Sequence, residues 1–283
     1  MSISPIAIFV KQALVPALCG LAACAEVQDE ERPLTLIVHS ETTFQSHWKE
    51  QERKWWGGTA EIDRADVYHY RARGSGFRVT DPTGRAVVVT ARHVVLPSVT
   101  NVEVQGITRL LSRPIGIRVR IDGASIQPER IVMDGESDLA LLWISRSEAA
   151  MLSARPVDLS KSVKPRLDQG VFVWGFPGTP NQYKGAPGSV TEIRDLFGVI
   201  NQHYAFGMSG GLVVAVDEAQ PRSLGLPVGI LVRSEAGAAP LSRFILMRHL
   251  ETLLSRSATT AIRYRDNMTL DELTRPSTAA MAR

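Results

Sequence analysis

The sequence contains very little cysteine. Of its 283 residues only Cys19 and Cys24 are cysteines, and both lie in the first 24 positions. The remainder of the chain therefore has no thiol to form a disulfide, to bind zinc as a thiolate or to act as a catalytic nucleophile. A domain of about 200 residues can be stable on its hydrophobic core alone, so the absence of disulfides does not exclude an exported protein.

The net charge is small as well. The 32 basic and 29 acidic residues leave a formal charge of +3. This imbalance is too small, and too evenly spread, to predict a nucleic-acid partner. An apolar fraction of 44% predicts a packed globular core, and no internal repeat is visible.

The first 23 residues form a distinct segment. They contain no acidic residue and a single basic one, Lys11, and a mostly apolar stretch covers residues 13–23. This stretch is too short for a comfortable membrane-spanning helix and suits the apolar region of a signal peptide. It ends in Leu21-Ala22-Ala23-Cys24, which resembles the lipobox of bacterial lipoproteins.

The lipobox resemblance implies that Cys24 receives a diacylglyceryl group and becomes the first residue of the mature chain. Two or more acyl chains would then hold the protein stably at a membrane. Two alternatives stay open, an ordinary cleavable signal and an uncleaved anchor. We expect residues 1–23 to be a signal peptide and residues 24–66 a tether and N-terminal extension, with a strand at residues 34–39.

From about residue 67 the chain has the pattern of an all-β protein. Short apolar or alternating segments recur between clusters of Gly, Pro, Asn and Asp. One helical pattern stands out, over residues 241–254, where apolar side chains share one face. Many short strands followed by a terminal helix predict a barrel or a sandwich. The predicted strands are residues 76–80, 86–90, 99–104, 115–121, 139–144, 171–174, 212–216 and 227–232.

Three of these segments carry side chains suited to nucleophilic catalysis. His93 ends a buried strand, Asp138 opens an apolar strand, and Ser209 lies in a glycine-rich turn before another strand. A serine hydroxyl becomes a good nucleophile when a histidine accepts its proton, and a carboxylate can orient that histidine. Taken singly, each residue has a simpler interpretation: a structural histidine, a turn or cap aspartate and a common glycine–serine turn.

Together the segments resemble the trypsin-like (chymotrypsin-fold) serine peptidase family of bacterial type. Residues 90–93 match its T-A-x-H box, residues 138–141 its D-[IL]-A-L box and residues 207–211 its G-x-S-G-G box. Gly74-Ser75-Gly76-Phe77 and Gly175-Phe176-Pro177-Gly178 match two further motifs, and the similarity covers about residues 70–255. It implies two six-stranded antiparallel β-barrels and a C-terminal helix over residues 67–256, followed by a tail at residues 257–283.

The family resemblance also implies roles for individual residues. His93, Asp138 and Ser209 would form a catalytic triad, and the backbone N–H groups of Gly207 and Ser209 would form the oxyanion hole. Asp134 is the alternative acid, although it lacks the following Leu-Ala-Leu. The implied protein is an exported serine endopeptidase that acts on polypeptides without metal or cofactor. We expect it on the periplasmic side of a bacterial cell envelope, lipid-anchored, or otherwise soluble in the periplasm or secreted.

The sequence departs from the family at Met208. Many animal members carry an aspartate there, which pairs with a new N-terminus after proteolytic activation, and a methionine cannot form that ion pair. No aspartate stands six residues before Ser209, so a preference for cleavage after Arg or Lys is not supported. His203 and Arg233 could favour an acidic or polar substrate side chain, but simple surface solvation explains them equally well.

Two other functions compete with a peptidase. A catalytically impaired trypsin-like fold could act as a binding or scaffold module at the cell envelope. A serine esterase of the α/β-hydrolase type would need the order Ser, Asp, His and alternating strands and helices, and this sequence has neither.

Overall fold

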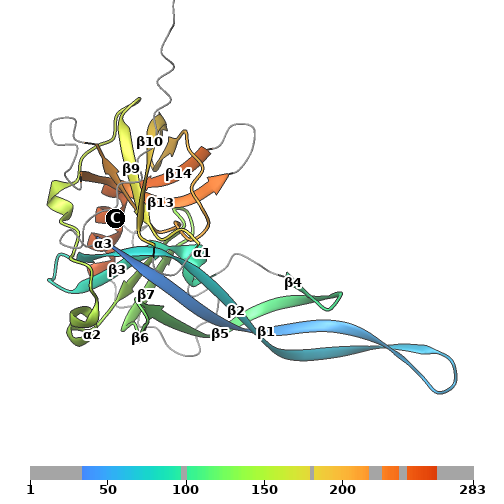
Figure 1. The fold of residues 1–283 in the computed structure, drawn as a ribbon. Coiled ribbons are helices and arrows are strands. Elements are labelled where there is room, and N and C mark those ends of the chain that lie inside the picture. The colour runs from blue at the N-terminus through green and yellow to red at the C-terminus, as the bar shows by residue number, and fades with distance from the viewer. Residues whose placement is uncertain (1–33, 97–100, 179–181, 217–224, 236–240, 260–283) are drawn as a thin grey trace, which may run out of the picture.

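The computed structural model describes the chain except for residues 1–33, 97–100, 179–181, 217–224, 236–240 and 260–283. The expected signal peptide and Cys24 therefore lie outside the described residues. Two β-sheet units make up the body, and a long arm leaves the first of them (Figure 1). The elements are β1 (Thr35–Arg53), β2 (Thr59–Thr80), β3 (Ala86–Ala91), α1 (Arg92–Val95), β4 (Asn101–Val104), β5 (Ile107–Ile121), β6 (Ala124–Ile126), β7 (Arg130–Asp134), β8 (Leu139–Trp143), α2 (Arg146–Met151), η2 (Leu159–Lys161), β9 (Gly170–Gly175), β10 (Lys184–Ile193), β11 (Phe197–Ile200), β12 (Leu212–Ala215), β13 (Leu226–Glu235), β14 (Leu241–Leu246) and α3 (Met247–Thr259).

The second unit is a closed barrel of six antiparallel strands in the order β10-β11-β14-β13-β12-β9. Strand β12 shows how its sequence fits this position. Val213 and Ala215 are buried in the barrel's own apolar cluster, whereas Leu212 and Val214 belong to the larger cluster shared with the first unit. Successive side chains of a strand point to opposite faces, so an entirely apolar strand can serve both cores.

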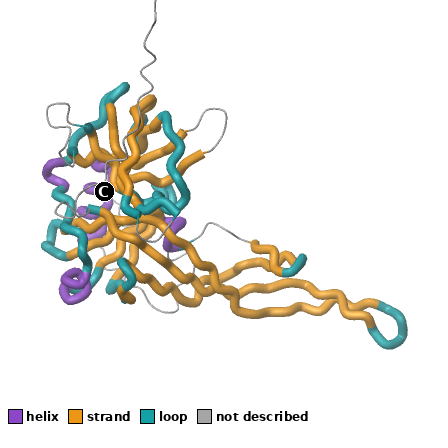
Figure 2. Tube along the Cα trace, in the orientation of Figure 1, coloured by secondary structure: helices purple, strands orange, loops and turns teal. Residues whose placement is uncertain are grey.

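The first unit is an eight-stranded antiparallel sheet that follows the path β4-β5-β1-β2-β3-β8-β7, with β6 paired to β5. The predicted fold class, all-β with a chymotrypsin-like pair of β units and a C-terminal helix, is confirmed. The prediction of two six-stranded barrels needs one refinement, because this unit is a larger, half-barrel sheet. Its strands β1 and β2 continue well past the core as the arm (Figure 2).

The N-terminal extension takes part in this sheet. The strand expected at residues 34–39 is the beginning of β1, and Leu36 and Val38 are completely buried in the core. β1 pairs with β2 on one side and with β5 on the other. Residues 35–47, which were assigned from the sequence to the extension before residue 67, are thus part of the first unit's sheet.

The predicted helix at residues 241–254 was wrong in its first half. Residues 241–246 form strand β14, and α3 begins at Met247. β14 pairs with β11 and β13 and so completes the barrel, with Phe244, Ile245 and Leu246 buried. Such long-range pairing overrides a local helical pattern, particularly in a segment with aromatic and β-branched residues.

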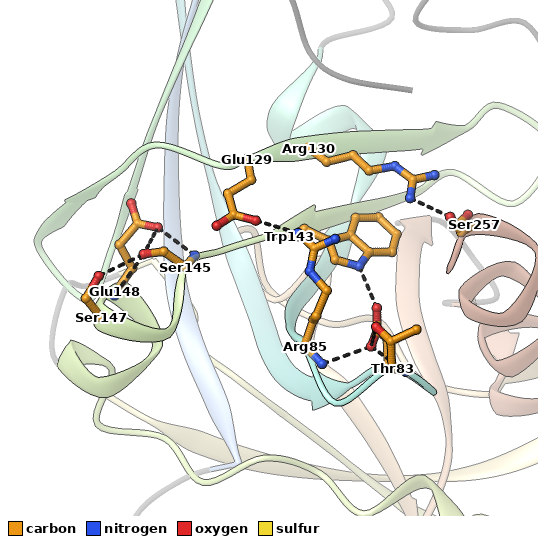
Figure 3. Close-up of polar contacts among 10 residues, drawn as sticks. Thr83, Arg85, Glu129, Arg130, Trp143, Ser145, Ser147, Glu148 and Ser257 are labelled. Atoms are coloured by element: carbon orange, nitrogen blue, oxygen red, sulfur yellow. Dashed lines mark hydrogen bonds and ion pairs between the residues drawn. The ribbon is translucent and has the colours of Figure 1, made fainter. Parts of the chain in front are cut away.

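Helix α3 is attached to the first unit by a polar network (Figure 3). Arg130 of β7 donates to the backbone carbonyl of Ser257, and its guanidinium lies 4.6 Å from the ring centre of Trp143. The Trp143 indole N–H donates to the buried carboxylate of Asp81, 2.9 Å away. The network therefore joins α3 to three segments of the first unit. None of the helices in the described part of the chain is long and apolar enough to span a membrane.

Candidate active site

His93 and Asp138 form a close pair at the ends of two neighbouring strands. β3 leads into α1, which carries His93, and Asp138 immediately precedes β8, the strand beside β3. Asp138 Oδ2 lies 2.7 Å from His93 Nδ1, and Asp138 Oδ1 accepts from the His93 backbone N–H at 3.1 Å. Both carboxylate oxygens therefore fix the same residue, and the ring keeps Nε2 for another group.

Strand β1 supports the helix that carries His93. The Ser40 hydroxyl donates to the carbonyl oxygen of Val94, and the Thr42 hydroxyl donates to that of Val95 at 2.7 Å. A four-residue helix cannot satisfy these carbonyls internally, so side chains from β1 do so. Sequence reasoning missed both residues. The signal that could have found them is the run of small hydroxyl side chains at alternate positions of β1.

Ser209 lies half-buried in the turn that leads into β12, against the first unit. Gly210, with a φ of 86°, passes so close to the backbone of Ser75 that a Cβ would overlap the Ser75 carbonyl oxygen. Gly74 is equally constrained, since a Cβ there would overlap the Val94 side chain and lie 2.8 Å from the Ser209 carbonyl oxygen. These two glycines allow the serine turn and the histidine helix to approach each other.

Ser75, the serine of the 74–77 motif, connects the two units at this point. Its backbone N–H donates to the Ser209 carbonyl at 2.7 Å, and its hydroxyl donates to the Gly207 carbonyl at 2.8 Å. The same hydroxyl accepts from the backbone N–H of Phe176 at 2.9 Å, and the residue is completely buried. One residue of the first unit thus holds both ends of the serine turn, a role that the motif match did not reveal.

The Ser209 hydroxyl and two backbone N–H groups of the turn form no hydrogen bond with the described part of the chain. In the part of the chain that the structure describes, no hydrogen bond joins the Ser209 hydroxyl to His93. The backbone N–H groups of Gly207 and Ser209 likewise donate to no described protein atom, whereas that of Gly210 donates to the Leu231 carbonyl at 2.7 Å. Two uncommitted N–H donors beside a serine are suited to bind a carbonyl oxygen that develops negative charge.

Asp134, the alternative acid, points to a different histidine. Its Oδ2 lies 3.0 Å from His249 Nε2 of α3 and accepts from the Ser137 hydroxyl. Burial alone would raise the pKa of Asp134, but the hydrogen bonds from His249 and Ser137 outweigh it and hold this pKa below its usual value. The structure thus pairs Asp138, and not Asp134, with His93.

Three other positions were singled out in the sequence: Met208, in the turn itself, and His203 and Arg233. Met208 is buried in the apolar cluster of the barrel, together with Tyr204 and Val173, so a packed side chain occupies the place of the activation carboxylate. His203 and Arg233 are exposed. No group of His, Cys, Asp and Glu that could hold a metal ion occurs among the described residues.

Comparison with known proteins adds a family match to this geometry. The sequence model of the trypsin-like peptidase domain matches residues 74–221, just over half of the chain. Among curated proteins, no sequence matches the chain.

Several hundred chains of solved structures resemble this one, and several of them are proteases. The serine endoprotease from Yersinia pestis shares 18% identity at a TM-score of 0.47, over 79% of this chain and 62% of that chain, so this chain spans less than two thirds of it. The serine protease domain of the Sesbania mosaic virus polyprotein shares 15% sequence identity at a TM-score of 0.47, over 80% of this chain and 95% of that chain. The protease Anisep from Arthrobacter nicotinovorans shares 11% sequence identity at a TM-score of 0.45, over 78% of this chain and 100% of that chain.

Proposed function

The chain belongs to the trypsin-like peptidase family, and on that premise we propose that it is an exported serine endopeptidase. The observation that carries the proposal is the pairing of His93 Nδ1 with Asp138 Oδ2 at 2.7 Å, beside a glycine turn that holds Ser209. The substrate class is polypeptide.

Each residue of the proposed triad has one task. The Ser209 hydroxyl attacks the scissile carbonyl while His93 Nε2 accepts its proton, and a tetrahedral intermediate forms. His93 gives the proton to the leaving amine as the C–N bond breaks, which leaves the acyl-enzyme, and the same imidazole then activates the water that hydrolyses the ester. Asp138 keeps the proton on Nδ1, so that Nε2 faces the serine as a base, and stabilises the imidazolium that forms.

The negative charge of the tetrahedral intermediate would be met by the N–H groups of Gly207 and Ser209. Neither group donates to a described protein atom, so both could donate to the substrate oxygen without breaking a hydrogen bond to the described part of the chain. Loss of one such donor typically lowers the rate by about 10²–10³-fold.

Export and anchoring form a separate part of the proposal. The sequence before residue 24 has the character of a signal peptide, and the motif ending at Cys24 supports lipidation of that thiol. The mature protein would then be held on the periplasmic side of a bacterial envelope. Mass spectrometry of the mature N-terminus tests this, and an unmodified Cys24 or cleavage at another position would reject it.

Activity is tested by labelling the purified protein with a fluorophosphonate probe, which reacts with activated serines. We expect labelling of the wild type and none of Ser209→Ala or His93→Ala. Circular dichroism of all three proteins would establish that they are folded. A folded wild type that stays unlabelled and cleaves no peptide would favour the alternative, a catalytically impaired fold that acts as a binding or scaffold module.

A further inference from the structure

The arm formed by β1 and β2 is the least compact part of the described structure (Figure 1). The two strands pair without interruption from Thr35 with Phe77 to Arg53 with Thr59. β5 lies beside β1 only as far as His47, so residues 48–53 and 59–64 continue as a two-stranded ribbon. At about 3.3 Å per residue, this ribbon carries the connecting turn roughly 20 Å beyond the point where the pairing of β1 with β5 ends.

Two adjacent tryptophans occupy the tip of the arm. Trp55 is 92% exposed and Trp56 64% exposed. They contact each other edge to face, with ring centres 5.5 Å apart, and neither belongs to an apolar cluster of the body. A tight turn is normally made of small or polar residues, so this turn does not need them. Large aromatic side chains exposed together mark a binding surface.

The ribbon below the tip is polar and internally paired. Lys49 bonds with Glu61 at 3.1 Å and Arg64 with Glu50 at 2.9 Å, both across the two strands. Glu52 pairs with Lys54 beside the turn at 3.2 Å. Ion pairs of this kind suit a ribbon surrounded by water, and they confine the exposed aromatic surface to the tip.

We propose that Trp55 and Trp56 insert into the interfacial region of a lipid bilayer. Tryptophan rings favour the level of the lipid headgroups, and the neighbouring exposed Arg53 can contact phosphates there. The carboxylate closest in sequence, Glu52, is neutralised by Lys54. A bilayer needs no complementary cavity, which suits a convex turn at the end of a ribbon. This membrane contact goes beyond the proposed peptidase activity and does not require a lipid on Cys24.

The test uses the full chain with Cys24→Ser, so that no acyl group contributes. The protein is mixed with vesicles of phosphatidylcholine and phosphatidylglycerol that carry bromine on their acyl chains, which quenches tryptophans that enter the bilayer. We expect quenching and a blue shift of the emission. The matched variant adds Trp55→Ala and Trp56→Ala and should lose both effects, although it keeps Trp48, Trp143 and Trp174.

Two results would overturn the inference. The first is equal quenching of the two proteins, or no quenching of either. This result counts even if residues 13–23 bind both proteins to the vesicles. The second is self-association without vesicles, seen by sedimentation velocity and lost in the double variant, since the tip would then bind a second copy. Both proteins should react equally with the fluorophosphonate probe in vesicle-free solution, so failure of the membrane contact is distinguishable from failure of the peptidase proposal.

Discussion

At the scale of single residues, Ser75 is the most informative position outside the proposed triad. Its hydroxyl holds the Gly207 carbonyl and the Phe176 N–H, and its own N–H holds Ser209. In Ser75→Ala the Gly207 peptide loses its anchor, and the adjoining oxyanion donors become misaligned. We expect kcat to fall about 10–100-fold with a smaller change in KM, since a donor out of place acts mainly in the transition state.

The conservative variant separates positioning from general stability. Ser75→Cys keeps a weaker donor of similar size, so its kcat should lie between those of the wild type and Ser75→Ala. Steady-state kinetics on one peptide substrate and a thermal melt of each protein provide the measurement. If both variants lose activity only in proportion to their loss of folded protein, Ser75 has a structural role alone.

The two aspartates near β8 offer a matched comparison. Asp138→Asn keeps the shape but lets His93 take the wrong tautomer, and we expect kcat to fall about 10⁴-fold. Asp134→Asn loses a contact to His249, so its principal effect should be on the free energy of unfolding, lowered by about 1–3 kcal/mol at neutral pH. Kinetics and urea denaturation of both variants measure the difference. Similar kinetic losses in the two variants would contradict these assignments.

The Asp134 contribution should also depend on pH in a defined direction. Its pKa is lower in the folded protein than in the unfolded chain. The stabilisation is therefore complete above about pH 4, the usual aspartate pKa, and is lost as the pH falls through the lowered value. The difference in unfolding free energy between wild type and Asp134→Asn should shrink over that acid range.

Sequence motifs predicted His93, Asp138 and Ser209 as a catalytic triad, and the structure places the first two in contact. They could not identify Ser75, Ser40 or Thr42 as supports. The role of these three residues depends on hydrogen bonds to backbone atoms far away in the chain. The alternation of Ser40 and Thr42 is visible in the sequence, but the backbone atoms that these side chains bind are not.

At the scale of elements, the turn between β2 and β3 depends on Asp81. Its buried carboxylate accepts from the Trp143 indole, from Thr83 and from the Arg85 N–H. Asp81→Ala leaves these donors without an acceptor, and we expect the free energy of unfolding to fall by about 3 kcal/mol. The exposed pair of Arg85 with Glu129 is the control, since Glu129→Gln should change it by less than about 0.5 kcal/mol. Equal losses by urea denaturation would contradict the prediction.

The elements that the sequence predicted are those with a local signal. The strands that lie beside the family boxes, β3, β8 and β12, are short, apolar and bounded by turn residues. The helix predicted at residues 241–246 is strand β14 because this segment pairs with β11, which lies far away in the sequence, as well as with the preceding strand β13. The outer half of β1 is charged and exposed, so no apolar alternation indicated a strand there.

At the scale of the whole molecule, the proposed site and the arm belong to the same strands. β2 runs from the tip of the arm to Ser75 at the serine turn, and β1 runs back from the tip to Ser40 and Thr42 beneath the histidine helix. The connection to the site lies entirely in the inner halves of these strands, where β5 and the core cover them. The outer ribbon is therefore structurally separable from the site.

This separability predicts the outcome of shortening the arm. Replacing residues 50–62 by Asn-Gly joins Lys49 to Asp63, which face each other in the register, through a turn suited to two-residue hairpins. Trp48 stays in place, 4.2 Å beneath the Arg109 guanidinium. We expect the melting temperature to stay within about 3 °C, since the removed ribbon buries no core side chain. Fluorophosphonate labelling of Ser209 should also persist, while quenching by brominated vesicles disappears. A shortened protein that melts far lower, or loses labelling in vesicle-free solution, would show that the outer ribbon supports the site.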